Sequence, residues 1–284
     1  MNDILKNTQT NIFLDSGDPN ETRQTMLLLD DSLQGQTTNP SLVAKSPEVQ
    51  EFLKVRKFTR EELFDKYRQI AFDISDVIPE GKISVEVYSD LQTQEYELYN
   101  QAQEINEWFP GIFVKLPITP AGLATASRLV AEGISVNMTL CFSQEQAAAV
   151  HAATKNAQNG AQVFVSPFIG RLDDIGQNGV DLIKNIQSMY IEWNSHVMVL
   201  GASIRSVEHI EACTSRAVAA ITIPFKLIQE IATGTISSVP KPPLQSIEYK
   251  TLNLSKSWDQ FDINHPLTTA GLEKFAADWN ALCE

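Results

Sequence analysis

The feature that most constrains the fold of this chain is an alternation of short apolar or β-branched runs with longer stretches of helical period, repeated about eight times. This rhythm predicts a (β/α)8 barrel, the TIM-barrel form of the α/β class. A doubly wound open sheet is the alternative, but no glycine-rich phosphate loop follows any run. The expected strands are residues 11–14, 35–38, 83–88, 112–116, 135–140, 162–165, 197–201 and 219–223. The expected helices are residues 20–29, 60–77, 91–106, 120–131, 144–154, 179–193, 207–215 and 225–233.

The length of 284 residues fits one large domain or two small ones, and α/β barrels routinely reach this size as one unit. We expect a single domain over residues 1–284, because no linker demands a second one. The rhythm breaks after residue 236. Residues 237–243 are rich in serine and proline, and residues 268–282 predict a closing helix packed across the barrel. Residues 237–284 are therefore expected to form a C-terminal extension.

The charge of the chain argues against one class of partner. The formal net charge is -13 and the sequence pI is about 4.8. Nucleic acid requires a concentrated basic face, so we expect no nucleic-acid partner. An anionic substrate would need local arginines strong enough to overcome the global field, and Arg171 and Arg205 are the candidates.

Membrane and metal signals are also missing from the sequence. No apolar run is long enough to span a bilayer, and the first 11 residues lack the features of a secretory signal. A cytoplasmic protein with no membrane partner is expected.

The cysteines, Cys141, Cys213 and Cys283, are odd in number and lack metal-ligand spacing, which favours reduced thiols. The histidines fall in or beside expected helices and loops, so we expect no metal, and a metal-dependent barrel hydrolase is disfavoured.

Lys115 stands alone among apolar residues in the expected strand 112–116. An exposed lysine has a pKa of about 10.4, and burial among apolar groups lowers the pKa of an amine and frees it as a nucleophile. The obvious chemistry is attack on a carbonyl to form a Schiff base. The ordinary alternative is a packed stem with the head in solvent, and this segment alone favours that alternative.

Polar side chains mark the ends of seven expected strands, which is where barrels of this kind place their chemistry. Each has a local explanation: Asp15 or Ser203 could cap a helix, and Asn39 before Pro40 could be a turn residue. Their occurrence together around one lysine is harder to explain by capping. The residues are Asp15, Thr38 and Asn39, Glu86, Lys115, Asn137 and Thr139, Ser166, and Ser203 with Arg205.

These residues lie in a set of motifs covering almost the whole chain to about residue 231, and with them the chain resembles the transaldolase family. The resemblance implies a class I aldolase-type Schiff-base barrel of carbohydrate metabolism, in the pentose phosphate pathway, without metal or cofactor. The motifs are Phe13-Leu14-Asp15, Gln36-Thr37-Thr38-Asn39-Pro40-Ser41-Leu42, Val85-Glu86-Val87, Val114-Lys115-Leu116-Pro117, Val136-Asn137-Met138-Thr139-Leu140, Val165-Ser166-Pro167-Phe168-Ile169-Gly170-Arg171 and Gly201-Ala202-Ser203-Ile204-Arg205.

The resemblance implies transfer of a dihydroxyacetone unit from sedoheptulose 7-phosphate or fructose 6-phosphate to glyceraldehyde 3-phosphate or erythrose 4-phosphate. Lys115 would form the Schiff base and Asp15 would move the hydroxyl proton. Glu86 and Thr139 would hold the water that shuttles protons. The implied binding residues are Asn39, Asn137 and Ser166 for the sugar hydroxyls, Arg171, Ser203 and Arg205 for the phosphate, and Phe168 at the same site.

The related fructose 6-phosphate aldolases resemble the same pattern, but they have glutamine in place of Glu86 and tyrosine in place of Phe168, and they lack Arg205. The chain therefore has the transferase set, and Phe168 offers no hydroxyl to position a water that would release the three-carbon unit. The alternatives are a lyase of that type, a non-catalytic sugar-phosphate-binding barrel, and a Schiff-base enzyme for another aldehyde or keto acid. The resemblance leaves a homo-oligomer open, because branches of the family differ in oligomeric state.

Overall fold

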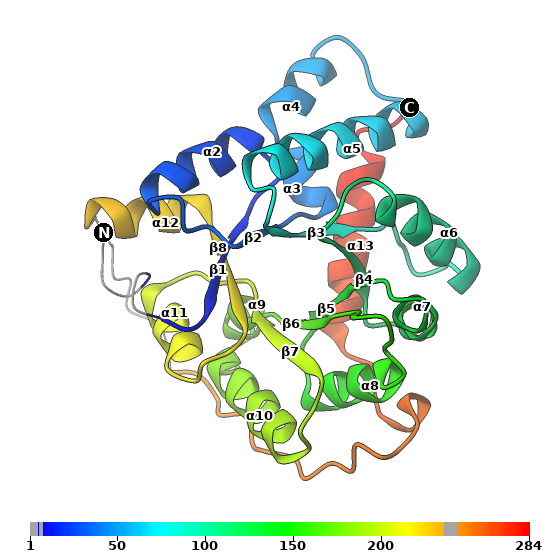
Figure 1. The fold of residues 1–284 in the computed structure, drawn as a ribbon, viewed down its shortest axis with the longest axis vertical. Helices are drawn as coiled ribbons and strands as arrows, with labels where there is room; N and C mark the ends of the chain where they lie inside the picture. Colours follow the sequence, from blue (N-terminus) through cyan, green and yellow to red (C-terminus); the bar gives the residue numbers. More distant parts are fainter. Residues whose placement is uncertain (1–4, 6–7, 236–242) are drawn as a thin grey trace.

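Eight parallel strands close into a barrel in chain order (Figure 1), which confirms the expected (β/α)8 fold. The computed structural model describes residues 5, 8–235 and 243–284. The strands are buried on both faces, as strands covered by crossover helices must be. They are β1 (Asn11–Asp15), β2 (Gly35–Thr37), β3 (Lys82–Glu86), β4 (Ile112–Pro117), β5 (Val136–Cys141), β6 (Val163–Pro167), β7 (Val197–Gly201) and β8 (Ala220–Pro224).

All eight expected helices form, with ends that shift by a few residues, and the sequence missed three short ones: α3, α4 and α9. Each of these has at most seven residues, too few to show a helical period. The helices are α2 (Pro19–Leu28), α3 (Pro40–Ala44), α4 (Pro47–Leu53), α5 (Arg60–Val77), α6 (Glu95–Asn106), α7 (Pro120–Ala131), α8 (Gln144–Thr154), α9 (Ile169–Asp174), α10 (Gly179–Glu192), α11 (Val207–Thr214), α12 (Phe225–Thr233) and α13 (Pro266–Asn280).

Helix α5 shows how the sequence sets these elements. Thr59 and Glu62 form a capping box, in which each side chain accepts a hydrogen bond from the other residue's backbone N–H. Leu63, Tyr67 and Ile70 then recur at helical spacing and are buried. The buried face of α5 that packs on the barrel therefore places Tyr67 beside the carboxyl end of β3.

The amino-terminal end of the barrel is filled by aromatic side chains. The rings of Phe13 and Phe113 lie 5.9 and 5.0 Å from the ring of Phe164. Lys82 Nζ lies over Phe164 and donates a hydrogen bond to Gln162 Oε1 at 2.7 Å. Because this end is packed, the interior opens toward the carboxyl ends of the strands.

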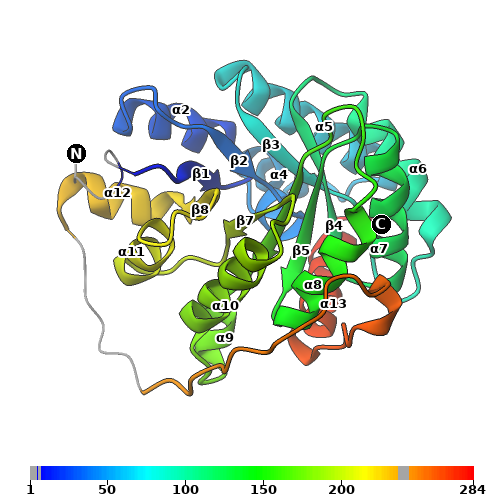
Figure 2. The same cartoon turned by 60° about the horizontal axis from the view of Figure 1, so that its bottom comes forward.

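The C-terminal part of the chain returns to the barrel as helix α13, which confirms the expected closing helix with a start two residues earlier. Figure 2 shows α13 beside β5, and it also packs against α3. Thr268 Oγ1 donates a hydrogen bond to the carbonyl of Leu140 at 2.9 Å, so the helix start is tied to the end of β5. Residues 237–242, within the expected serine- and proline-rich run, lie outside the described residues, as do residues 1–4 and 6–7.

None of the described helices combines the length and the apolar character that crossing a membrane requires.

Candidate active site

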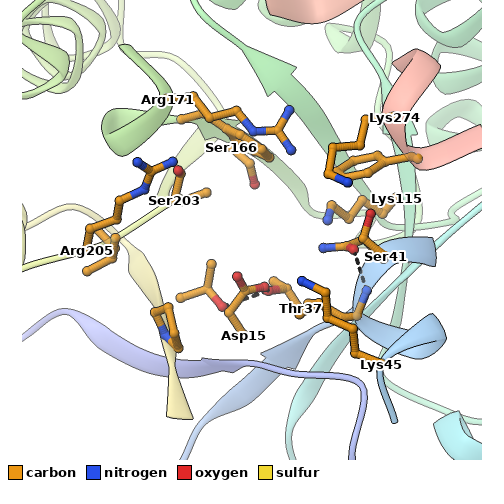
Figure 3. A pocket seen from close by; sticks show the side chains of 18 residues that line it. Asp15, Thr37, Ser41, Lys45, Lys115, Ser166, Arg171, Ser203, Arg205 and Lys274 are labelled. Atoms are coloured by element: carbon orange, nitrogen blue, oxygen red, sulfur yellow. Dashed lines mark hydrogen bonds between the residues drawn. The ribbon is translucent and has the colours of Figure 1, made fainter. Parts of the chain in front are cut away.

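A pocket of about 260 Å³ opens at the carboxyl ends of the strands (Figure 3). The structure brings together all eleven predicted site residues, in two layers. Eight line the pocket: Asp15, Asn39, Lys115, Ser166, Phe168, Arg171, Ser203 and Arg205. The other three, Glu86, Asn137 and Thr139, are buried and do not line it; the strand registers place them beside Lys115 or its neighbours on β4.

Lys115 is 3% exposed, so the alternative of a head group reaching open solvent is wrong. Its Nζ donates a hydrogen bond to the backbone carbonyl of Thr38 at 3.0 Å. It also lies 3.0 Å from Glu86 Oε2, an ion-pair contact rather than an aligned hydrogen bond. The amine is therefore buried, but its surroundings are not the apolar ones predicted from its strand neighbours, because parallel pairing places Glu86 directly beside Lys115.

Glu86 is buried, and this desolvation raises the pKa of its carboxyl, while the charge of Lys115 lowers it. Its backbone N–H donates to the hydroxyl of Tyr67 at 3.0 Å, which fixes the end of β3 against α5. Thr139 Oγ1 is buried and has no hydrogen-bond partner among the described residues. A buried hydroxyl without a partner is costly, so this atom is suited to a water or a substrate.

Asp15 stands at the end of β1, where its carboxyl accepts a hydrogen bond from Thr37 Oγ1 at 2.8 Å. Part of its surface opens to the pocket, and the rest is enclosed by the barrel. Burial raises the pKa of Asp15, and the charge of Lys115 and the Thr37 hydrogen bond limit that rise. Helix α2 is capped by Asp18 instead, so the capping explanation of Asp15 is wrong.

An amide and two hydroxyls form a hydrogen-bonded row that joins β3, β5 and β6 inside the barrel. Ser166 Oγ donates to Asn137 Oδ1 at 2.7 Å, and Asn137 Nδ2 donates to Ser84 Oγ at 3.0 Å. This row fixes the Ser166 hydroxyl at the pocket wall. Asn39 also lines the pocket, and its Oδ1 accepts from the backbone N–H of Leu42, so it is the N-cap of α3 and not the turn residue that its place before Pro40 suggested.

Arg171 reaches the pocket from α9 between two aromatic rings. Its guanidinium carbon lies 5.1 Å from the ring centre of Phe168 and 5.2 Å from that of Phe275. It makes no ion pair within the described parts of the chain, and burial lowers its pKa below the usual arginine value. A charged guanidinium with free donors is available for an anion.

Arg205 reaches the same part of the pocket from the loop after β7. It pairs with Asp174 of α9, and its side chain stays 46% exposed. A Cβ at Gly170 would lie 2.6 Å from Arg205 Nε, so glycine is needed for this approach. Ser203 lines the pocket with a left-handed φ of 56°, and the cap of α11 is Ser206, so Ser203 is no helix cap.

Several pocket residues were missed because little in their local sequence marks them. Thr37 and Thr222 share a 2.7 Å hydrogen bond beneath Asp15, and of these two only Thr37 belongs to one of the motifs. The others come from α3, α5 and the C-terminal helix, which only the fold brings to the strand ends. They are Ser41, Lys45, Lys274 and Phe275 at the pocket wall, and Tyr67 behind it, where its hydroxyl contacts Glu86.

Within the described ranges, no three His, Cys, Asp or Glu side chains are grouped so that they could hold a metal ion. The groups at the pocket are instead an amine, carboxyls, hydroxyls and guanidiniums, which can carry nucleophilic and acid–base chemistry on an anionic ligand.

The fold and site define an eight-stranded α/β barrel with a buried strand lysine, flanked by carboxyls, in a cationic pocket. The family model described as "Transaldolase/Fructose-6-phosphate aldolase" matches residues 12–284. The chain belongs to the transaldolase/fructose-6-phosphate aldolase family.

Curated relatives extend over nearly the whole chain. A probable transaldolase of Dehalococcoides mccartyi is 32% identical over 95% of this chain and 98% of its own. One of Herpetosiphon aurantiacus is 32% identical over 94% of each chain, and one of Lysinibacillus sphaericus is 34% identical over 87% of this chain and 88% of its own. A solved enolase of the mandelate racemase subgroup from Agrobacterium tumefaciens covers 77% of this chain and 55% of its own, at 14% identity and a TM-score of 0.47.

Proposed function

We propose that this chain is a transaldolase. It transfers a dihydroxyacetone unit from sedoheptulose 7-phosphate or fructose 6-phosphate to glyceraldehyde 3-phosphate or erythrose 4-phosphate. The observation that carries the proposal is the Lys115 amine, buried at the pocket wall 3.0 Å from the Glu86 carboxylate. The pocket also holds Arg171 and Arg205, which suit a phosphorylated sugar.

The reaction begins with attack of Lys115 Nζ on the ketone carbon of the donor. The amine must lose a proton to attack, and Glu86 is near enough to receive it, with a pKa that burial raises above its ordinary value. Loss of water from the carbinolamine then gives the iminium. Glu86 and Thr139 hold the water that carries protons in this step, because Thr139 Oγ1 has no other partner among the described residues.

Asp15 performs the proton transfer that cleaves the sugar. It takes the hydroxyl proton from C4 while the C3–C4 bond breaks, and the electron pair flows into the iminium to leave an enamine on Lys115. The aldose phosphate departs, and a second one arrives. Asp15 then returns the proton as the new bond forms. The raised pKa of Asp15 suits a group that must gain and lose a proton in each cycle.

The binding roles follow from position. Asn39, Asn137 and Ser166 hold the sugar hydroxyls, and the Ser166–Asn137 hydrogen bond orients both groups. Arg171, Arg205 and Ser203 hold the phosphate. Arg205→Ala should therefore weaken binding of phosphorylated sugars more than that of unphosphorylated ones.

The test is borohydride reduction with fructose 6-phosphate, followed by peptide mass mapping. A reduced dihydroxyacetone adduct on Lys115 is expected, and Lys115→Met should lose both adduct and turnover while keeping the fold. Lys82→Met is a matched control, because Lys82 also lies on a barrel strand but at the packed end. Normal transfer by a folded Lys115→Met protein would contradict the mechanism, and a folded wild type without adduct would leave a sugar-phosphate-binding barrel.

Release of the three-carbon unit, as by a fructose 6-phosphate aldolase, is the second candidate. Phe168 is buried to 7% exposure and presents only its ring, which favours transfer over release. Glu86→Gln combined with Phe168→Tyr should raise free dihydroxyacetone relative to transfer product. An unchanged partition in that double variant would remove the role given to these two positions.

Compartment and assembly complete the proposal. We expect the protein to act in the cytoplasm on sugar phosphates, with no nucleic-acid or membrane partner. A homo-oligomer stays a prediction, which light scattering of the purified chain at several concentrations would test.

A further inference from the structure

The pocket is cationic in a chain whose net charge is -13. Among the ionisable side chains that line it, five are basic, namely Lys45, Lys115, Arg171, Arg205 and Lys274, and Asp15 is the single acid. Lys115 is the proposed nucleophile, and Arg171 with Arg205 suffices for one phosphate. Lys45 and Lys274 therefore remain as two cations to which the proposed reaction assigns nothing.

These two lysines form a cluster built like the arginine cluster. Each cluster has two cations, one carboxylate that accepts from one of them, and one serine. In the first, Arg205 pairs with Asp174, Arg171 is unpaired within the described residues, and Ser203 lies beside them. In the second, Lys274 Nζ lies 3.0 Å from Asp278, Lys45 makes no ion pair with any described residue, and Ser41 lines the wall.

Asp278 gives the lysine cluster its position. Its carboxylate accepts hydrogen bonds from Ser41 Oγ of α3 and from Lys274 Nζ within α13. This shared acceptor ties α13 to α3, the helix whose C-cap is Lys45. One carboxylate therefore faces two ammonium groups, and the cluster keeps a net positive charge toward the pocket.

The two clusters lie on opposite sides of the pocket (Figure 3). Arg171, Arg205 and Ser203 occupy one side, whereas Lys45, Lys274 and Ser41 occupy the other, which is also the side of Lys115. A ketose bound through C2 to Lys115 sends its long arm across the pocket toward the arginines. C1 is then left on the lysine side.

From this arrangement we infer that Lys45 and Lys274 form a second anion subsite, which accepts a phosphate on O1 of a ketose 1,6- or 1,7-bisphosphate donor. The inference rests on the proposed Schiff-base function and extends its donors from ketose monophosphates to ketose bisphosphates. Two phosphates would then be held at once, one by each cluster, with the ketone carbon between them.

A bisphosphate donor reacts through the same steps as a monophosphate donor. Lys115 Nζ adds to C2 and water leaves to give the iminium. The C3–C4 bond breaks with its electron pair moving to C3, the C4 hydroxyl proton goes to Asp15, and an aldose phosphate departs. The enamine on Lys115 keeps the 1-phosphate. Protonation at C3 and addition of water release dihydroxyacetone phosphate, and addition to an aldehyde transfers it.

The subsite can be tested without any chemistry. Glucitol 6-phosphate and glucitol 1,6-bisphosphate have no carbonyl, so calorimetric titration of the full chain with each measures binding alone. We expect the bisphosphate to bind at least tenfold more tightly. In the double variant Lys45→Met with Lys274→Met this preference should fall below threefold, and in Lys45→Met alone to an intermediate value. Lys54→Met, at an exposed lysine paired with Glu51, is the control and should keep the wild-type preference.

Two results would overturn the subsite: a wild-type preference below threefold, or a preference that the folded double variant keeps in full. Lys45→Met leaves the Lys274–Asp278–Ser41 contacts in place, so it still tests the subsite if the double variant does not fold. Borohydride trapping separates this inference from the proposed function. No adduct from either ketose would contradict the Schiff base and leave the titrations valid, whereas an adduct from fructose 6-phosphate without a bisphosphate preference would contradict only the subsite.

Discussion

Arg171 lies over the ring of Phe275, with its guanidinium carbon 5.2 Å from the ring centre, although the two residues belong to α9 and to the C-terminal helix α13. Phe168 covers the guanidinium from a second direction at 5.1 Å. No carboxylate among the described residues pairs with Arg171. Its orientation therefore depends on aromatic faces, which leave its hydrogen-bond donors available for a phosphate.

Phe275→Leu should weaken the binding of phosphorylated sugars, because it removes a cation–π contact worth on the order of 1 kcal/mol. We expect the half-saturating fructose 6-phosphate concentration to rise about three- to tenfold, with a smaller change in kcat. Steady-state kinetics measure this effect. Phe261→Leu, at another buried ring in the C-terminal segment, controls for lost packing. Equal losses in the two variants would argue against a role for the Phe275 ring in positioning Arg171.

Two glycines allow the arginines to take their positions. A Cβ at Gly271 would lie 2.7 Å from Arg171 Nη1 and 2.6 Å from Leu140 Cδ2. A Cβ at Gly170 would meet the backbone oxygen of Ser203 at 2.5 Å and Arg205 Nε at 2.6 Å. Gly271→Ala and Gly170→Ala should each displace one arginine and raise the half-saturating phosphate-sugar concentration, with less effect on unphosphorylated donors.

Gly234→Ala is the control for these glycine variants. Gly234 has a φ of 70° with nothing near its Cβ position, so alanine there should cost about 1 kcal/mol of stability through backbone strain alone. Thermal unfolding and kinetics would be compared for the three proteins. If Gly234→Ala impaired phosphate-sugar binding as much as the other two, general destabilisation would be the better explanation.

Tyr67→Phe should lower both stability and turnover. The Tyr67 hydroxyl accepts from the backbone N–H of Glu86 at 3.0 Å and lies 2.6 Å from Thr38 Oγ1. Thr38 Oγ1 already donates to the Ser84 carbonyl, so Tyr67 is the donor in its bond to Thr38. Removing the hydroxyl leaves the Glu86 N–H buried and unpaired, at a cost of about 1–3 kcal/mol.

The matched control for Tyr67→Phe is Tyr190→Phe. Tyr190 is buried and donates one hydrogen bond to the carbonyl of Ala147 at 2.7 Å, away from the pocket lining. Denaturant unfolding should show a loss of stability in both variants. Only Tyr67→Phe should also reduce kcat, because Thr38 and Glu86 hold Lys115. A normal kcat in Tyr67→Phe would show that the hydrogen bonds of Tyr67 to Thr38 and Glu86 do not affect the reaction of the Lys115 amine.

Asp15→Asn should abolish turnover and stabilise the protein at neutral pH. The pKa of Asp15 in the folded chain is raised by burial above its ordinary value of 3.8. Between the unfolded and folded pKa values the native state binds more protons than the unfolded state, so the free energy of unfolding decreases as pH rises through that window. Below pH 3.8 both states are protonated and the penalty disappears.

The neutral amide avoids this penalty, so the stabilisation by Asp15→Asn should be on the order of 1 kcal/mol at pH 7.5 and shrink toward pH 4. Unfolding curves of the two proteins across this pH range measure it. Asp18→Asn is a useful comparison, because Asp18 is a carboxyl that caps α2. A gain for Asp15→Asn that did not vary with pH would show that ionisation of Asp15 is not its cause.

The fold could be predicted because each strand and helix carries its own local signal. The change between strand and helix periods, the helix caps and the apolar faces of the helices can each be recognised within a few consecutive residues. An order of eight strand–helix units then leaves few ways to close the sheet. The short helices α3, α4 and α9 were not predicted, because they are too short to show a helical period. The single-domain division remains a prediction.

The sequence by itself determined the barrel and the set of polar side chains at its strand ends, because strand direction and alternation follow from local pattern. Only the tertiary structure decided what those side chains contact. Parallel register set Glu86 beside Lys115, and the return of the chain through α13 brought Lys274 and Phe275 to the pocket. These contacts join residues far apart in sequence, so they depend on packing between elements, which no local pattern encodes.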